Sequence, residues 1–171
     1  MPSSAITIRK AEPADAPHFV HFNTAMAWET ESLKLDEAKI RAGVDGLFNK
    51  PQYGFYVLAE CDGVVAGGLM ITYEWSDWRN KVFWWIQSVY VLPEHRGQGI
   101  YRSLYAGVRQ MAEADGECCG FRLYVEKTNT AAQEVYKKLG MEASHYAMFE
   151  GYAEPPIPVH PPQETPQVPR P

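Results

Sequence analysis

The 171-residue sequence has few cysteines, no surplus of basic residues and no long apolar run. Its three cysteines, Cys61, Cys118 and Cys119, show no CxxC spacing, which argues against a disulfide framework or a structural zinc site and is typical of a reducing compartment. A formal net charge of −5 argues against a general nucleic-acid binder, because phosphate contacts need clustered Lys and Arg. No run approaches the roughly 18 apolar residues of a membrane span, and no secretory signal opens the chain. We therefore predict a cytoplasmic protein with neither a membrane nor a nucleic acid as partner.

The composition is that of a globular domain, with 46% hydrophobic and 22% charged residues. The length suits one domain with a sizeable core. Most of the 13 prolines lie in EPPIPVHPPQETPQVPRP, which begins at Glu154 and cannot form a helix or a strand ladder. The sequence thus predicts a folded domain over 1–153 and a Pro-rich C-terminal tail over 154–171.

Periodicity along the domain predicts a mixed α/β fold. Alternating apolar residues indicate strands over 5–10, 55–60, 64–73, 121–125 and 144–150, and Asp62-Gly63 is typical of a hairpin turn. The continuous apolar run over 81–91 indicates a central strand that is buried on both faces. Helices are expected from Asp15 and over 36–48, 99–114 and 130–139, with a loop at ETESLKL. Because hairpin strands precede a crossover helix, the sheet should be mixed.

The segment VLPEHRGQGIYRSLY places Gly97 and Gly99 between a predicted strand and a predicted helix, directly after Arg96. Backbone N–H groups at a helix start attract anions, glycine allows a ligand close approach, and arginine adds a charge-assisted contact. The pattern is not a Walker loop, and a Rossmann fingerprint would need a third glycine at Arg102. On these residues alone, a phosphate cradle and a plain strand-to-helix turn are equally open.

Two motifs together resemble the GCN5-related N-acetyltransferase (GNAT) family. Arg96 to Tyr101 matches the family's pyrophosphate motif, and RLYVEKTNTAAQEVYKKLGM follows at the family's spacing. The resemblance covers roughly 85–141 and implies the GNAT fold, in which a mixed sheet is splayed between two parallel strands and flanked by helices. It also implies acetyl-CoA (coenzyme A) as cosubstrate. Tyr101 departs from the pattern, because the family usually has Gly or Ala there.

The resemblance places acetyl-CoA between the strands over 87–91 and 121–125. A bulge on the first strand would point backbone groups at the cofactor, and the glycine turn would bind the pyrophosphate. Asn129 would contact the pantetheine arm, although a plain helix N-cap is the alternative. The cofactor-binding residues implied are Val89, Tyr90, Val91, Arg96, Gly97, Gln98, Gly99, Ile100, Tyr101, Arg102, Asn129, Ala132 and Tyr136.

Acetyl transfer to an amine needs a neutral nucleophile and a proton for the leaving thiolate. In relatives, the tyrosine that matches Tyr136 is placed to protonate the CoA sulfur; the alternative is a core-edge aromatic. The strand VFWWIQSVYV has no carboxylate, although some relatives carry the base there. The resemblance leaves Glu29, Glu31, Glu74 and Asp77 as candidate bases, because their segments border the family's substrate cleft; for each, a plain surface carboxylate is the alternative, and a base acting through ordered water is also open. Glu74 is the preferred candidate, because partial desolvation between aromatics would make its carboxylate more basic. The predicted acceptor-binding residues are Glu29, Glu31, Glu74, Trp75 and Gln87.

His18 and His21 lie three residues apart on a predicted helix but have no third ligand, so no metal site is predicted. The resemblance instead implies an N-acetyltransferase that moves an acetyl group from acetyl-CoA to a primary amine, through direct attack and a tetrahedral intermediate. The acceptor would be a small amine or an amino-acid-like molecule, and a homodimer is left open. The alternative is a non-catalytic acyl-CoA-binding or protein-interaction module on the same fold, in which the missing strand carboxylate reflects lost chemistry.

Overall fold

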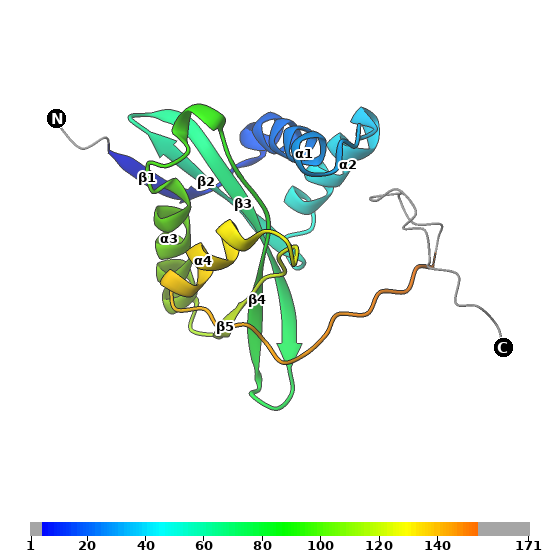
Figure 1. Cartoon of the computed structure of the whole chain (residues 1–171), viewed down its shortest axis with the longest axis vertical. Helices are drawn as coiled ribbons and strands as arrows, with labels where there is room; N and C mark the ends of the chain where they lie inside the picture. The colour runs from blue at the N-terminus through cyan, green and yellow to red at the C-terminus, as the bar shows by residue number, and fades with distance from the viewer. Residues whose placement is uncertain (1–4, 154–171) are drawn as a thin grey trace.

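A computed structural model describes residues 5–153, and the predicted Pro-rich tail lies outside them. Its centre is a five-stranded mixed sheet in the order β1-β2-β3-β4-β5 (Figure 1). Neighbours from β1 to β4 are antiparallel, whereas β4 and β5 are parallel. The run over 81–91 is confirmed as an inner strand, because β4 lies between β3 and β5. The strands are β1 (Ile6–Lys10), β2 (Gly54–Cys61), β3 (Val64–Ser76), β4 (Lys81–Val91) and β5 (Cys118–Arg122).

Helices flank both sides of this sheet, with α1 and α2 at one side and α3 and α4 at the other (Figure 1). α1 contacts β3 and β4 and α2 contacts β2, whereas α3 contacts β1, β2, β3 and β5. Within the described residues, no helix combines the length and the apolar character that crossing a membrane requires. The helices are α1 (Ala16–Glu31), α2 (Glu37–Phe48), α3 (Ile100–Asp115) and α4 (Thr130–Lys138), with short 3-10 turns η1 (Pro13–Asp15) and η2 (Pro93–His95).

Two cores lie on the two faces of the sheet, built by alternation along the strands and by a register shift in β4 between Gln87 and Tyr90. Trp84 belongs to the core beneath α3, together with Leu104 and Val108 of that helix. Tyr90 of the same strand belongs to the opposite core, where it packs on Phe22 of α1. Burying each of these side chains stabilises the fold by about 1.5–3 kcal/mol. The two cores bury Trp84, Ile86 and Tyr90 of β4, whereas its other side chains are partly or fully exposed, so the burial expected on both faces is only partly present.

The hairpin between β2 and β3 follows from its turn residues. Asp62 and Gly63 have φ angles of 52° and 80°. Positive φ at both central positions is the requirement of the type I′ turn, which matches the twist of paired strands. The predicted Asp62-Gly63 hairpin is therefore confirmed.

Two predicted boundaries were wrong. α1 continues through Glu31, so Glu29 and Glu31 lie on a helix and not in a loop; the helix ends only where Ser32 adopts a left-handed φ of 52°. β5 covers Cys118–Arg122 and not 121–125, because its pairing with β4 ends at Arg122.

The predicted strand over 144–150 is absent from the structure, and the prediction was wrong. Its alternation is weak, and an extended segment without a ladder partner gains little stability. Tyr146 and Phe149 in this segment are 73% and 94% exposed. These aromatic residues therefore contribute little to the hydrophobic core of their own chain.

Candidate active site

β4 and β5 pair over a short length and then part. Their parallel ladder runs from Val82 opposite Cys118 to Trp85 opposite Arg122, where the pairing recorded for the described residues ends. We call the following stretch the β4–β5 fork: residues 87–91 of β4 and residues 123–126 after β5. Backbone groups on the facing sides of the fork are not joined by this ladder, so they can bond an extended polar ligand.

β4 carries a β-bulge at the fork. Gln87 pairs with Met70 and Tyr90 pairs with Gly68, so Ser88 and Val89 together face a single residue of β3. Ser88 has a φ of 50°, a left-handed conformation that residues other than glycine rarely adopt. A bulge turns backbone groups out of the ladder. The bulge expected on this strand is thus present, beside the predicted cofactor contacts Val89, Tyr90 and Val91.

The glycine turn that leads from β4 into α3 is open to a ligand. Gly97 and Gly99 have φ angles of 75° and 82°, and a Cβ built on either would meet no atom within 4 Å. No side chain caps the start of α3. The N–H groups of its first turn have no partners within the helix. These donors, at the positive end of the helix dipole, fit the pyrophosphate of CoA.

α4 places the other two motif residues. Asn129 accepts a hydrogen bond from the Ala132 N–H at 3.1 Å and so caps α4, which confirms the N-cap alternative and leaves the side-chain NH₂ available. Tyr136 packs edge-to-face on Tyr101 of α3, with ring centroids 5.6 Å apart. Burial raises the pKa of Tyr136, so its hydroxyl keeps its proton at neutral pH. A proton donor must be in that state.

Glu29 joins the end of α1 to the glycine turn. Its Oε1 accepts a hydrogen bond from the Tyr90 hydroxyl at 2.6 Å, and its Oε2 accepts one from Arg96 Nη2 at 2.8 Å. Arg96 Nε also donates to the Val91 carbonyl oxygen at 2.9 Å. The Tyr90 hydroxyl and then the Arg96 guanidinium lower the pKa of Glu29. Glu29 is therefore ionised and already bonded, which makes it a poor general base.

A polar group of side chains lies on the sheet beside the fork. Glu74 accepts hydrogen bonds from Trp85 Nε1 and Arg122 Nη1, each at 2.5 Å. Gln87 donates to Thr72 Oγ1 at 2.8 Å. Strand alternation puts these side chains on the face that carries Tyr90, and all are partly exposed. We call this group the Glu74 cluster: Thr72, Glu74, Trp85, Gln87 and Arg122.

The cluster contains two of the predicted acceptor residues, Glu74 and Gln87. Each oxygen of Glu74 already accepts one hydrogen bond, from Trp85 and from Arg122. Trp75 alternates to the other face of β3 and is 59% exposed, so the structure does not bring it into the cluster. Glu31 is the last residue of α1. The catalytic roles themselves stay predictions.

Sequence reasoning missed Arg122, which lies 48 residues from Glu74. Its guanidinium also lies over the Phe83 ring, 3.9 Å from the centroid. The available signal was an arginine inside the otherwise apolar strand pattern FRLYV. An arginine held on a partly covered sheet face needs a partner, and a carboxylate on a neighbouring strand supplies it.

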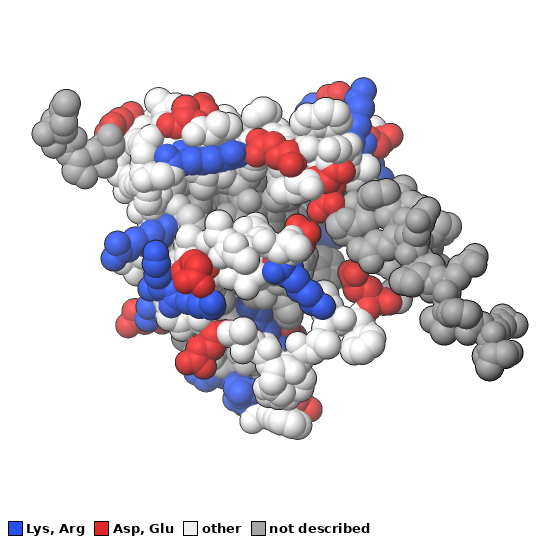
Figure 2. Space-filling view, viewed as in Figure 1, with Lys and Arg blue, Asp and Glu red and all other residues white. Residues whose placement is uncertain are grey.

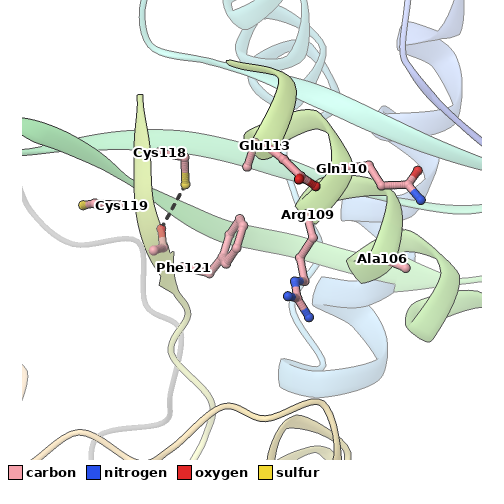
Figure 3. A pocket seen from close by; sticks show the side chains of 9 residues that line it. Ala106, Arg109, Gln110, Glu113, Cys118, Cys119 and Phe121 are labelled. Carbon is pink, nitrogen blue, oxygen red and sulfur yellow. Dashed lines mark hydrogen bonds between the residues drawn. The ribbon is translucent and has the colours of Figure 1, made fainter. Parts of the chain in front are cut away.

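A surface concavity of the protein does not include these residues. It is a surface hollow of about 570 Å³ between α3 and β5, to which Arg109, Glu113, Cys118 and Phe121 contribute (Figure 3). None of the predicted site residues lines it. Burial raises the pKa of the Cys118 thiol, whose Sγ lies 3.4 Å from the Gly120 carbonyl oxygen, so this cysteine is a poor nucleophile. The hollow is not the candidate active site.

The charged side chains of the described residues form neither a surface of one sign nor a metal site. Basic and acidic side chains are interspersed over the face shown in Figure 2. Residues 5–153 contain no group of three or more His, Cys, Asp or Glu side chains that could hold a metal ion. From the contacts above, the candidate active site consists of the fork, the glycine turn, α4 and the Glu74 cluster.

A parallel fork with a bulge, followed by an uncapped glycine turn, is the arrangement that the resemblance to acyl-CoA-binding transferases implies. The model of the acetyltransferase (GNAT) family matches residues 15–141, and the chain belongs to this family. It is accordingly an acetyltransferase, with acetyl-CoA as its cosubstrate.

Individual relatives agree with the family assignment. The chain is 30% identical to thialysine N-epsilon-acetyltransferase of Sus scrofa, over 88% of this chain and 95% of that one. The structure of a possible acetyltransferase from Clostridium difficile 630 superposes with a TM-score of 0.81 and 39% identity, covering 87% of this chain and 98% of that one. AAC(6')-Iy, solved with a bisubstrate analogue that contains CoA, has a TM-score of 0.71 at 19% identity, over 87% and 99% of the two chains, and shares the fold.

Proposed function

We propose that the protein transfers an acetyl group from acetyl-CoA to the primary amine of a small, amino-acid-like acceptor. The observation that carries the proposal is the position of the fork. The uncapped glycine turn follows directly from its β4 arm, and Tyr136 reaches back from α4 to the same helix start. One extended cosubstrate can thus have its pyrophosphate at the turn and its thioester at the bulge.

Acetyl-CoA, the acetyl donor, is bound by backbone groups more than by side chains. The N–H groups from Gly97 to Tyr101 bind the pyrophosphate, and the backbone of Val89 and Val91 bonds the pantetheine arm at the bulge. The NH₂ group of Asn129 is free of its capping role and contacts the same arm. Tyr136 donates its proton to the sulfur as the thiolate leaves. Its raised pKa favours the protonated form that this role needs.

The acceptor side is the Glu74 cluster. Glu74 and Arg122 form an ion pair there, with side chains each 38% exposed, so opposite charges stand together next to the fork. The carboxylate suits an ammonium group, and the guanidinium suits a carboxylate through paired hydrogen bonds. A molecule with both groups, such as an α-amino acid with a second amine, matches this pair. The curated relative named for thialysine supports the same acceptor class.

Acceptor binding also gives Glu74 a way to act as the base. When the acceptor carboxylate binds Arg122, it can replace Glu74 Oε1 as the acceptor of the hydrogen bond from that guanidinium. The released oxygen can then take a proton from the attacking ammonium, which produces the neutral amine. The amine attacks the thioester carbonyl directly, and the tetrahedral intermediate collapses as Tyr136 protonates the thiolate. The proton that the attacking nitrogen then loses returns through water to the Tyr136 phenolate, and Glu74 passes its proton to solvent.

The test is thiol release from acetyl-CoA in the presence of single amines. Thialysine and lysine should release CoA in proportion to the acetylated product found by mass spectrometry. Cadaverine, which is lysine without its carboxylate, should react with a higher KM. Acetyl-CoA binding with no thiol release for any amine would support the non-catalytic alternative and contradict the proposal.

We also propose that the protein forms a homodimer. Its support is the segment after α4, where Tyr146, Phe149 and Tyr152 are more than half exposed in the single chain. Exposed aromatics of this kind are typical of surfaces that another protein covers. Sedimentation velocity should give the mass of two chains, and the mass of one chain at micromolar concentration would contradict it.

A further inference from the structure

The hydroxyl of Tyr101 is an unusual group in this protein. Among the side chains that the structure describes, its oxygen is the buried polar atom for which no hydrogen-bond partner is found. Burial, and then the neighbouring Tyr136 and Tyr105, raise the pKa of Tyr101 well above its usual value. The hydroxyl therefore stays protonated and is available as a donor.

Such a group is costly to keep. A buried hydroxyl without a partner loses its hydrogen bonds to water and gains none in return, so phenylalanine would serve the packing better. An orphaned polar group in a native structure calls for an explanation, and a bound group that completes it is one. A hydroxyl is also unexpected at this position, because the GNAT motif usually has Gly or Ala there.

The location of Tyr101 indicates which ligand group completes it. Tyr101 is the second residue of α3, and its N–H is the last of those proposed to bind the pyrophosphate. Its ring meets Tyr136, the residue proposed to lie at the thioester sulfur, with centroids 5.6 Å apart. Tyr101 thus stands between the residues assigned to the two ends of the bound cosubstrate, where the pantetheine arm would pass.

We infer that the Tyr101 hydroxyl donates a hydrogen bond to an amide carbonyl oxygen of the pantetheine arm of acetyl-CoA. The inference rests on the proposed function, which places the arm in the fork. The contact makes Tyr101 a cosubstrate-binding residue through its side chain, in addition to any contact of its backbone N–H. Its ring also supports that of Tyr136, and this packing does not depend on the hydroxyl.

Tyr101→Phe separates the two contributions, because it removes the hydroxyl and keeps the ring. Calorimetry should show that the Kd of acetyl-CoA rises roughly tenfold, the value of one net hydrogen bond. The Kd of 3′-phosphoadenosine 5′-diphosphate, which is the nucleotide part of CoA without the arm, should not change. The Tm of the free protein should stay level or rise, because an unpaired buried hydroxyl has been removed.

Tyr105→Phe is the matched control. Tyr105 is a buried tyrosine of the same helix, but its ring packs on Phe121 of β5. Its variant should bind both ligands like the wild type. An unchanged acetyl-CoA Kd in Tyr101→Phe would overturn the inference, and so would equal weakening of the nucleotide, which would assign the contact to the pyrophosphate. A wild type that binds no acetyl-CoA would refute the proposed function, and this inference with it.

Discussion

Replacing Gly99 by alanine tests the pyrophosphate site without a bulky side chain. Gly99 begins α3 with a φ of 82°, and Gly116 ends the same helix with a φ of 78°. A Cβ at either position would meet no atom within 4 Å. The two substitutions therefore impose the same backbone strain, about 1–2 kcal/mol for a left-handed alanine. Each should lower Tm by roughly 2–8 °C.

Only the Gly99→Ala variant should lose affinity for acetyl-CoA. Its new methyl group occupies the space through which a phosphate approaches the N–H groups at the helix start. Losing one charge-assisted hydrogen bond costs about 1.5–3 kcal/mol. That cost corresponds to a roughly 10- to 150-fold higher Kd. Calorimetry well below both Tm values measures it, and Gly99→Ala binding acetyl-CoA as tightly as Gly116→Ala would refute the reasoning.

Three further predictions concern the proton donor, the acceptor and the fold. Tyr136→Phe should lower kcat by roughly 100-fold or more with little change in acetyl-CoA Kd; unchanged turnover would remove Tyr136 from the mechanism. Arg122→Gln should raise KM for lysine or thialysine far more than for cadaverine, and an equal rise for both would exclude carboxylate recognition. Hydrogen bonds from Arg9, at 2.7 and 3.0 Å, lower the pKa of Asp15 in the folded protein. The ionised Asp15 therefore stabilises the fold fully above its unfolded pKa of about 4, and this stabilisation is lost as pH falls through the lower pKa of the folded state. Asp15→Asn should thus reduce Tm at pH 7, with a deficit that narrows in melts below about pH 4; a constant deficit would contradict it.

Features that depend on a few neighbouring residues could be predicted from the sequence. Asp62-Gly63 specifies its own turn, and Asn129 caps α4 through a bond to Ala132, three residues on. The long apolar run of β4 indicates an inner strand wherever its neighbours lie. The glycines at 97 and 99 adopt the positive φ that their type permits. In each case the physical cause is contained in the local sequence.

Features that depend on how distant segments meet could not be predicted. The ion pair of Arg96 with Glu29 joins residues 67 apart, and it depends on α1 continuing into the segment that was expected to be a loop. The contact of Glu74 with Arg122 requires the registers of β3, β4 and β5 together. The end of β5 is set by where its ladder with β4 stops, not by its own alternation. The segment 144–150 shows the converse, since a strand pattern without a partner forms no strand.

The measurement that tests the central claim most directly is a crystal structure of the protein with CoA. The account predicts that the pyrophosphate lies within hydrogen-bonding distance of the N–H groups between Gly97 and Tyr101. It also predicts the sulfur beside the Tyr136 hydroxyl and the arm along the bulge of β4. CoA bound outside the β4–β5 fork, for example in the hollow between α3 and β5, would contradict it.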